Sequence, residues 1–205
     1  MDSPTSNLFW WKNMPVGRPA LPIRVFALFT MGLLTACNPP QPLNFSVQNV
    51  QASPVSLDAD LRGITVTTGA PNERTGNLPP EVATVTNVWK EATQEALARA
   101  AIFDDDSHRH VNLEVKILKF DAPGAGITFP TDTDASYTIV DRATGAVIFS
   151  QLISAQGTTP MDFAFVGAIR QRESINRSVQ NNIAAFIDAL EHNPAAVSRI
   201  KRLTS

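Results

Sequence analysis

A single cysteine, Cys37, occurs among the 205 residues of this chain. No disulfide can form within the chain, so its folded part must be held by packing and hydrogen bonding alone. The chain also lacks the short motifs that most directly indicate an enzyme. It contains no Gly-x-Ser-x-Gly nucleophile elbow, no Gly-x-x-x-x-Gly-Lys phosphate loop and no His-Glu-x-x-His zinc motif. By motif, the sequence therefore predicts no catalytic residue, no cofactor and no metal.

The apolar run Val25–Leu34 is too short to span a membrane, because a spanning helix needs roughly 20 apolar residues. Lys12, Arg18 and Arg24 place positive charge ahead of this run. A positive flank followed by a short apolar run is typical of a signal peptide. Met14 offers a second start, which would give a signal peptide of more ordinary length and leave the mature chain unchanged.

The Leu34-Thr35-Ala36-Cys37 order follows directly on the apolar run and resembles the bacterial lipobox. That resemblance implies a lipid on the Cys37 thiol and cleavage of the chain just before this residue. The next five residues, Asn38-Pro39-Pro40-Gln41-Pro42, are typical of an extended, solvated tether. The alternatives are an ordinary buried thiol in a core strand, cleavage without lipid, and an uncleaved anchor.

Cleavage before the cysteine leaves 169 residues, enough for one domain with a real core. We predict a signal peptide over 1–36, a tether over 37–43, a single α+β domain over 44–193 and a C-terminal tail over 194–205. Cleavage also removes three basic residues and one acidic residue, which leaves 14 Lys and Arg against 18 Asp and Glu. The mature chain is therefore mildly acidic. This argues against nucleic-acid binding, which usually needs a clustered basic surface.

Hydrophobic periodicity predicts the element order strand, helix, strand, hairpin, helix. Strands are expected over Leu61–Thr67, Val111–Ile117, Ala135–Asp141 and Ala146–Ala155, and long helices are expected from Pro79-Pro80 and from Gly167 or Ala168. The first helix shows an apolar stripe over about 23 residues, and the last helix ends at Asn193-Pro194. This order predicts an α+β fold, with a mostly antiparallel sheet and both long helices packed on one face.

Two predicted loops contain apolar residues. The first, Asp121–Pro130, is flexible at its glycines and contains Ile127 and Phe129, which either fold back onto the domain or contact a partner or the membrane. Ile127 and Phe129 are therefore candidate contact residues. The second predicted loop, Gly157–Phe165, is indicated by its glycine and its proline. In the last helix, Arg172 lies in line with the apolar stripe, where it either caps the sheet edge, pairs with a buried carboxylate or binds an anion.

Asp104–His110 is a local cluster of carboxylates and imidazoles, groups that can bind a divalent metal. A solvated turn is the favoured interpretation, because three carboxylates at the negative end of a helix oppose its continuation. Asp121, Asp132 and Asp134 could form an acid-base pair in space, but their spacing defines no geometry. Trp89 lies on the apolar stripe of the first helix, which favours a core position over a ligand platform.

The order of these elements from Cys37 to Leu190 supports a family resemblance. A lipobox, a Gly-Ile-Thr-Val strand, a long helix, a His-Val-Asn-Leu-Glu-Val-Lys-Ile-Leu strand, a hairpin and a closing helix follow one another. This order resembles the small bacterial envelope lipoproteins of the YajG type. More distantly, it is similar to auxiliary lipoproteins of ABC-type transporters and to the lipopolysaccharide-assembly lipoprotein. The resemblance implies a membrane-tethered, non-catalytic partner of an envelope machine.

We therefore expect a lipid-anchored periplasmic accessory or assembly factor that is not an enzyme. Its expected partners are the membrane, through lipidated Cys37, and an envelope protein. Asn38, not an aspartate, follows the cysteine, which indicates the outer membrane by the sorting rule of well-studied lipoproteins. One alternative is a carrier of a small ligand or lipid on the open sheet face beneath the Ile127/Phe129 loop. Another is a hydrolase that uses residues of the Asp104–His110 cluster.

Overall fold

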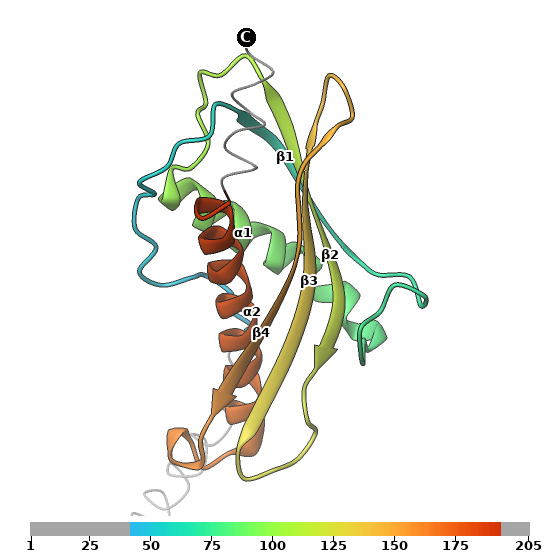
Figure 1. Cartoon of the computed structure of the whole chain (residues 1–205). Coiled ribbons are helices and arrows are strands. Elements are labelled where there is room, and N and C mark those ends of the chain that lie inside the picture. The colour runs from blue at the N-terminus through green and yellow to red at the C-terminus, as the bar shows by residue number, and fades with distance from the viewer. Residues whose placement is uncertain (1–41, 194–205) are drawn as a thin grey trace, which may run out of the picture. The chain divides into compact units, whose positions relative to one another are not determined.

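The computed structural model of this protein describes residues 42–193. The predicted signal peptide, Cys37, most of the predicted tether and the predicted tail lie outside the described residues. Four strands form one sheet in the order β1-β2-β3-β4, and two helices accompany it (Figure 1). The elements are β1 (Asp60–Thr68), η1 (Pro80–Val85), α1 (Thr86–Ala100), β2 (His110–Asp121), β3 (Phe129–Asp141), β4 (Val147–Thr159), η2 (Met161–Phe163) and α2 (Gly167–Glu191), where η marks a 3-10 helix.

The sheet is mixed, because β1 pairs with β2 in the parallel direction while β2–β3 and β3–β4 are antiparallel. The chain leaves β1, passes through η1 and α1, and returns as β2. Such a helical crossover is the usual connection between parallel neighbours. The structure confirms the predicted α+β fold, with this one difference in strand direction.

Alternation along the strands gives the sheet a covered face and an open face. In β3, for example, Ala135, Tyr137 and Ile139 are buried, whereas Ser136 and Thr138 between them are partly exposed. The covered face packs against the apolar stripes of α1 and α2, which include Trp89 and Phe186. The open face is polar. No helix among residues 42–193 has both the length and the apolar content needed to cross a membrane.

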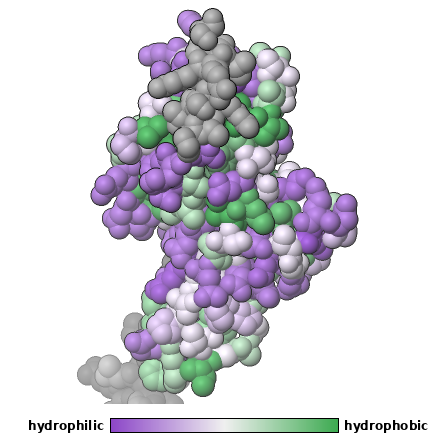
Figure 2. Space-filling model, in the orientation of Figure 1, coloured by the Kyte–Doolittle hydropathy of each residue, from purple (hydrophilic) through white to green (hydrophobic). Residues whose placement is uncertain are grey.

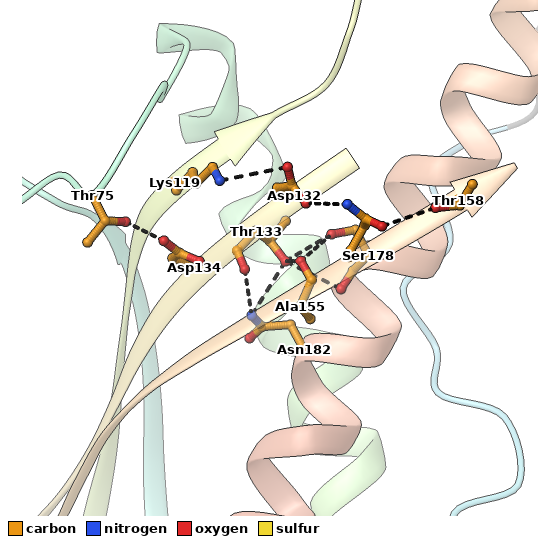
Figure 3. Close-up of polar contacts among 10 residues, drawn as sticks. Thr75, Lys119, Asp132, Thr133, Asp134, Ala155, Thr158, Ser178 and Asn182 are labelled. Carbon is orange, nitrogen blue, oxygen red and sulfur yellow. Dashed lines mark hydrogen bonds and ion pairs between the residues drawn. The ribbon is translucent and has the colours of Figure 1, made fainter. Parts of the chain in front are cut away.

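Three small polar side chains of α2 lie against the covered face of the sheet. Ser174, Ser178 and Asn182 recur every four residues and are completely buried. Thr131 shares a hydrogen bond of 2.7 Å with Ser174. Thr133 shares one of 3.0 Å with Ser178, and Figure 3 shows this pair. This side of the helix is a buried polar strip that brings α2 close to β3 and β4.

Gly157 explains why α2 can come so close. The sequence predicts a loop from this residue onwards, but Gly157 lies inside β4, where it pairs with Thr131 of β3. A Cβ atom at this position would lie 2.7 Å from the backbone carbon of Arg177, and closer still to backbone atoms of Ser174 and Ser178. Glycine is therefore required here because a helix backbone occupies the space that a side chain would fill.

Tyr137 connects both helices to the sheet at the centre of the core. Trp89 Nε1 donates to the Tyr137 hydroxyl at 3.3 Å, and this hydroxyl donates to Asn182 Oδ1 at 2.9 Å. The Tyr137 ring stacks on Phe186, with 4.1 Å between the ring centres. Burial raises the pKa of the Tyr137 hydroxyl well above its usual value, against a smaller lowering by the Trp89 hydrogen bond.

Tyr137 is the single tyrosine of the chain, so tyrosinate absorbance reports on this residue alone. Its pKa is higher in the folded state than in the unfolded state, where it is about 10. The stability that this difference contributes is complete below pH 10 and is lost as the pH rises above it. In an alkaline titration we expect tyrosinate to appear together with the loss of circular dichroism. Tyrosinate that appears near pH 10 while the circular dichroism is unchanged would contradict this burial.

Candidate interaction surface

Exposed apolar side chains gather at one end of the domain, where the β2–β3 loop and η2 meet the start of α2 (Figure 1). We name this group the apolar tip; its members are Ile127, Met161, Phe163, Phe165, Val166 and Ile169. Figure 2 shows green, hydrophobic atoms at this lower end of the domain. Exposed large apolar side chains that gather at one end of a domain commonly mark a binding surface. The apolar tip is therefore the strongest candidate site among residues 42–193.

Arg170 holds the backbone of the apolar tip in place. Its side chain is buried, and its Nη1 donates to the carbonyl oxygens of Ala164 and Phe165, the latter at 3.0 Å. The guanidinium also lies 5.4 Å from the centre of the Phe129 ring, a cation–π contact. Phe165, whose carbonyl is fixed by this arginine, has a fully exposed side chain. The Phe165 side chain is therefore exposed on a backbone that hydrogen bonds hold in place.

A second contact joins the β2–β3 loop to the same end of α2. Gln171 Nε2 donates to the carbonyl oxygen of Pro123 at 2.8 Å. Arg177, two turns further along α2, places its guanidinium 5.2 Å from the centre of the Phe163 ring. The β2–β3 loop and the continuous segment of η2 and α2, which are far apart in the sequence, therefore form one surface.

The two candidate contact residues of the sequence analysis lie in different environments. Ile127 is exposed and belongs to the apolar tip. Phe129 is the first residue of β3 and is buried beneath Arg170, so in this arrangement its ring supports the apolar tip from below. Arg170, not Arg172, is the buried arginine of α2. The signal that could have located the apolar tip was the sequence Met161–Val166, in which four of six residues are large and apolar.

The described chain begins at the same end of the domain. Leu43 lines an apolar depression of about 270 Å³ together with Phe120, Ala122, Val82 and Ile175. Ala122 directly precedes the β2–β3 loop, and Ile175 lies in the first half of α2.

From this depression the chain runs along α2 in the same direction as the helix. The Asn44 amide donates to Asn176 Oδ1 at 3.0 Å, and Gln180 donates to the Asn44 carbonyl oxygen at 3.0 Å. Further on, Val47 lines a depression together with Ile187, near the C-terminal end of the helix. Followed backwards towards residue 42, the chain therefore leads towards the apolar tip.

The Asp104–His110 cluster does not converge on a common point. His110 Nδ1 accepts from Arg62 Nε at 3.2 Å and lies 3.4 Å from an oxygen of Asp60, on the neighbouring strand. Arg109 Nε donates to Asp141 Oδ2 at 2.7 Å. Burial would raise the pKa of Asp141, but hydrogen bonds from the Thr144 and Ala143 amides and from Arg109 lower it below its usual value. These partners are those of a structural turn.

The three other carboxylates of interest lie near one another on β2 and β3, and two of them have hydrogen-bond partners of their own. Asp132 accepts from Gln156 Nε2 at 2.9 Å and lies 3.7 Å from Lys119 Nζ, while Asp134 accepts from Thr75 (Figure 3). Asp121 pairs with Asp132 in the β2–β3 register. Within the described part of the chain, the set of three potential ligands whose atoms lie close together is Asp188, Glu191 and His192, at the C-terminal end of α2.

The open face of the sheet holds a depression of about 350 Å³. Hydroxyl and charged side chains line it, among them Thr65, Thr67, Glu114, Lys116 and Thr138, together with Val115 and Leu118. A lining of this kind offers both hydrogen bonds and apolar contact.

No protein-family model matches the sequence, and no curated protein matches it. Solved structures do resemble the fold. Protein XCC0632 from Xanthomonas campestris, of family DUF330, gives a TM-score of 0.52 at 8% identity, over 78% of this chain and 96% of that chain. At this identity, the likeness shows a shared fold.

Two further structures have lower similarity. The PelC dodecamer from Paraburkholderia phytofirmans gives a TM-score of 0.40 at 10% identity, over 67% of this chain and 92% of that chain. A minor lipoprotein from Acinetobacter baumannii gives 0.32 at 13% identity, over 63% of this chain and 90% of that chain. Bacterial proteins named as lipoproteins are thus among the structural neighbours of the chain.

Proposed function

We propose that this chain is a lipid-anchored protein of the bacterial cell envelope, of the YajG type, that acts as a non-catalytic accessory or assembly factor. The lipid is attached to Cys37, and the domain faces the periplasm from the outer membrane. One observation carries the proposal. The lipobox Leu34–Cys37 is followed within a few residues by a folded domain that has an exposed apolar tip at the end where the described chain begins.

The arrangement of polar groups also favours a binding role over catalysis. A catalytic acid-base pair requires two groups within reach of one substrate atom. Among the groups singled out by the sequence, His110, Asp132 and Asp134 are each engaged by a hydrogen bond from another side chain. The apolar tip, in contrast, is ordered, exposed and formed from two segments that are far apart in the sequence. An envelope protein that binds this domain while its lipid holds it at the membrane is the expected partner.

The anchor can be tested with Cys37→Ser in the full-length chain, produced in a bacterial host fed with an alkyne analogue of palmitate. Because Cys37 is the single cysteine, we expect the variant to lose the label completely and to leave the membrane fraction. Thr35→Ser, which keeps a small hydroxyl residue inside the same motif, is the matched control and should retain the label. A Cys37→Ser protein that still carries label would show that the anchor assignment is wrong.

A second candidate function is a carrier of a small ligand. The apolar depression lined by Leu43, Val82, Val85, Phe120 and Ile175 favours it, because its lining has little polar surface. At about 270 Å³ the depression is near the lower limit of ligand-binding pockets. A lipid or other small molecule that remains bound in native mass spectrometry of the purified protein would support this function.

A further inference from the structure

The large apolar side chains of the apolar tip are exposed over much of their surface. Phe165 is fully exposed, and Ile127, Met161 and Val166 each expose half of their surface or more. Transferring such side chains from water into an apolar medium is favourable, roughly in proportion to the apolar area that is buried. Burial of these side chains would therefore favour association strongly. What has to be identified is the apolar medium that buries them.

The length of the chain between Cys37 and the folded domain restricts which apolar medium the tip can reach. Leu43 is the sixth residue after Cys37, and an extended chain of six residue steps spans at most about 22 Å. Leu43 lies beside Ile175 of α2. Eight residues back along the helix, Gly167 opens α2 about 12 Å away, at a rise of 1.5 Å per residue. The tether is therefore long enough for the lipid of Cys37 and the apolar tip to lie in one membrane surface.

The direction of the chain agrees with its length. Residues 44–47 run along α2 towards its C-terminal end, so the first described residues, 42 and 43, lie on the side of its N-terminal end, where the apolar tip is. A lipid at Cys37 would hold that end of the domain near the bilayer at high local concentration. A second copy or a protein partner would have to compete with a bilayer that the tether always keeps within reach.

We propose that the apolar tip inserts into the interfacial region of the same bilayer that holds the Cys37 lipid, and so acts as a second membrane contact that orients the domain. This inference depends on the lipid anchor proposed above. It identifies a lipid bilayer as the medium that covers the apolar tip. The members of the tip are uncharged, and the charged group between them, the exposed Asp162 of η2, is acidic. Insertion is therefore driven by apolar burial and does not require anionic lipid.

Tryptophan fluorescence can test the insertion in the intact lipidated protein. The full-length chain is produced in bacteria with Phe165→Trp and reconstituted in vesicles of phosphatidylcholine with or without bromine on the acyl chains. Bromine quenches only a tryptophan that lies in the bilayer. The natural Trp89 of the mature chain is completely buried and supplies a constant background. We expect Trp at position 165 to lose most of its emission in the brominated vesicles.

Val147→Trp is the matched control. Val147 is 49% exposed, and it lies at the other end of β4, twelve residues from Thr159, or about 40 Å along the strand. We expect no quenching there. Vesicle flotation is measured on the same samples, and it separates the two proposals.

Each outcome has a defined meaning. A protein that floats with the vesicles but is not quenched at position 165 is anchored without tip insertion, which overturns the inference and leaves the anchor standing. A blue shift at position 165 without quenching would assign the surface to a second copy of this chain, because the vesicles contain no other protein, and would equally overturn the inference. A protein that does not float overturns the anchor, and the inference with it. Equal quenching at positions 165 and 147 would contradict the proposed orientation.

Discussion

Replacing Gly157 with alanine is expected to destabilise the domain by about 3 kcal/mol or more, because the new methyl group meets a helix backbone. The nearest atoms belong to the main chain of Ser174, Arg177 and Ser178 in α2. Main-chain atoms cannot move aside by a change of rotamer, so the whole of α2 would have to shift away from β3 and β4. For a domain of this size, the melting temperature should fall by roughly 10 °C.

Gly124→Ala is the control for the Gly157 variant. No atom lies within 4 Å of a Cβ built at Gly124, which is exposed in the β2–β3 loop. We expect its melting temperature, followed by circular dichroism, to stay close to that of the unsubstituted protein. Shortening the side chains of Ser174 and Ser178 should not rescue Gly157→Ala, since the conflict is with their backbone. A Gly157→Ala protein of normal stability would show that α2 does not pack on β4 at this distance.

Removal of the Asn182 amide is expected to have an effect of similar size. Asn182 is completely buried; its Oδ1 accepts from the Tyr137 hydroxyl, and its Nδ2 donates to the carbonyl oxygens of Ile153 at 3.0 Å and Thr133 at 3.3 Å. In Asn182→Ala these groups lose a partner inside the core. An unsatisfied buried polar group costs about 1 to 3 kcal/mol. We therefore expect the free energy of unfolding to fall by roughly 3 kcal/mol in urea titrations.

The neighbouring residue provides a strict comparison. Asn181 has the same side chain, but it is exposed and makes one hydrogen bond, from Nδ2 to the Gln156 carbonyl oxygen at 2.8 Å. Asn181→Ala should cost no more than about 1 kcal/mol. Similar losses for the two variants would mean that the buried network contributes no more than a surface hydrogen bond, and would contradict the role we assign to Asn182.

These two variants and the membrane experiment test different parts of the molecule. Gly157 and Asn182 determine how α2 is seated on the sheet, and α2 in turn carries Arg170, which fixes the backbone below Phe165. Loss of that packing should disturb the apolar tip indirectly. Substitution of Phe165 itself changes only the exposed surface. A comparison of the two classes therefore separates the stability of the domain from its membrane contact.

The fold class and the order of the elements were predictable from the sequence alone. Alternation along Val111–Ile117 and Ala135–Asp141, and the apolar stripes of the two long helices, follow from local periodicity, which is a property of each segment by itself. The lipobox and the tether are also local features of the chain, and the lipid anchor at Cys37 stays a prediction.

The tertiary structure decided the features that depend on partners from elsewhere in the chain. Ser174, Ser178 and Asn182 look like a solvated helix face in the sequence, but hydroxyl and carbonyl groups of β3 and β4 satisfy them in the core. Gly157 looks like a loop residue, and only the approach of α2 makes it an obligatory strand glycine. The apolar tip joins Ile127 to residues 161–169 across a large gap in sequence. Local sequence patterns cannot predict such contacts, because the burial of a side chain and the hydrogen bonds of a buried polar group depend on how the helices pack on the sheet.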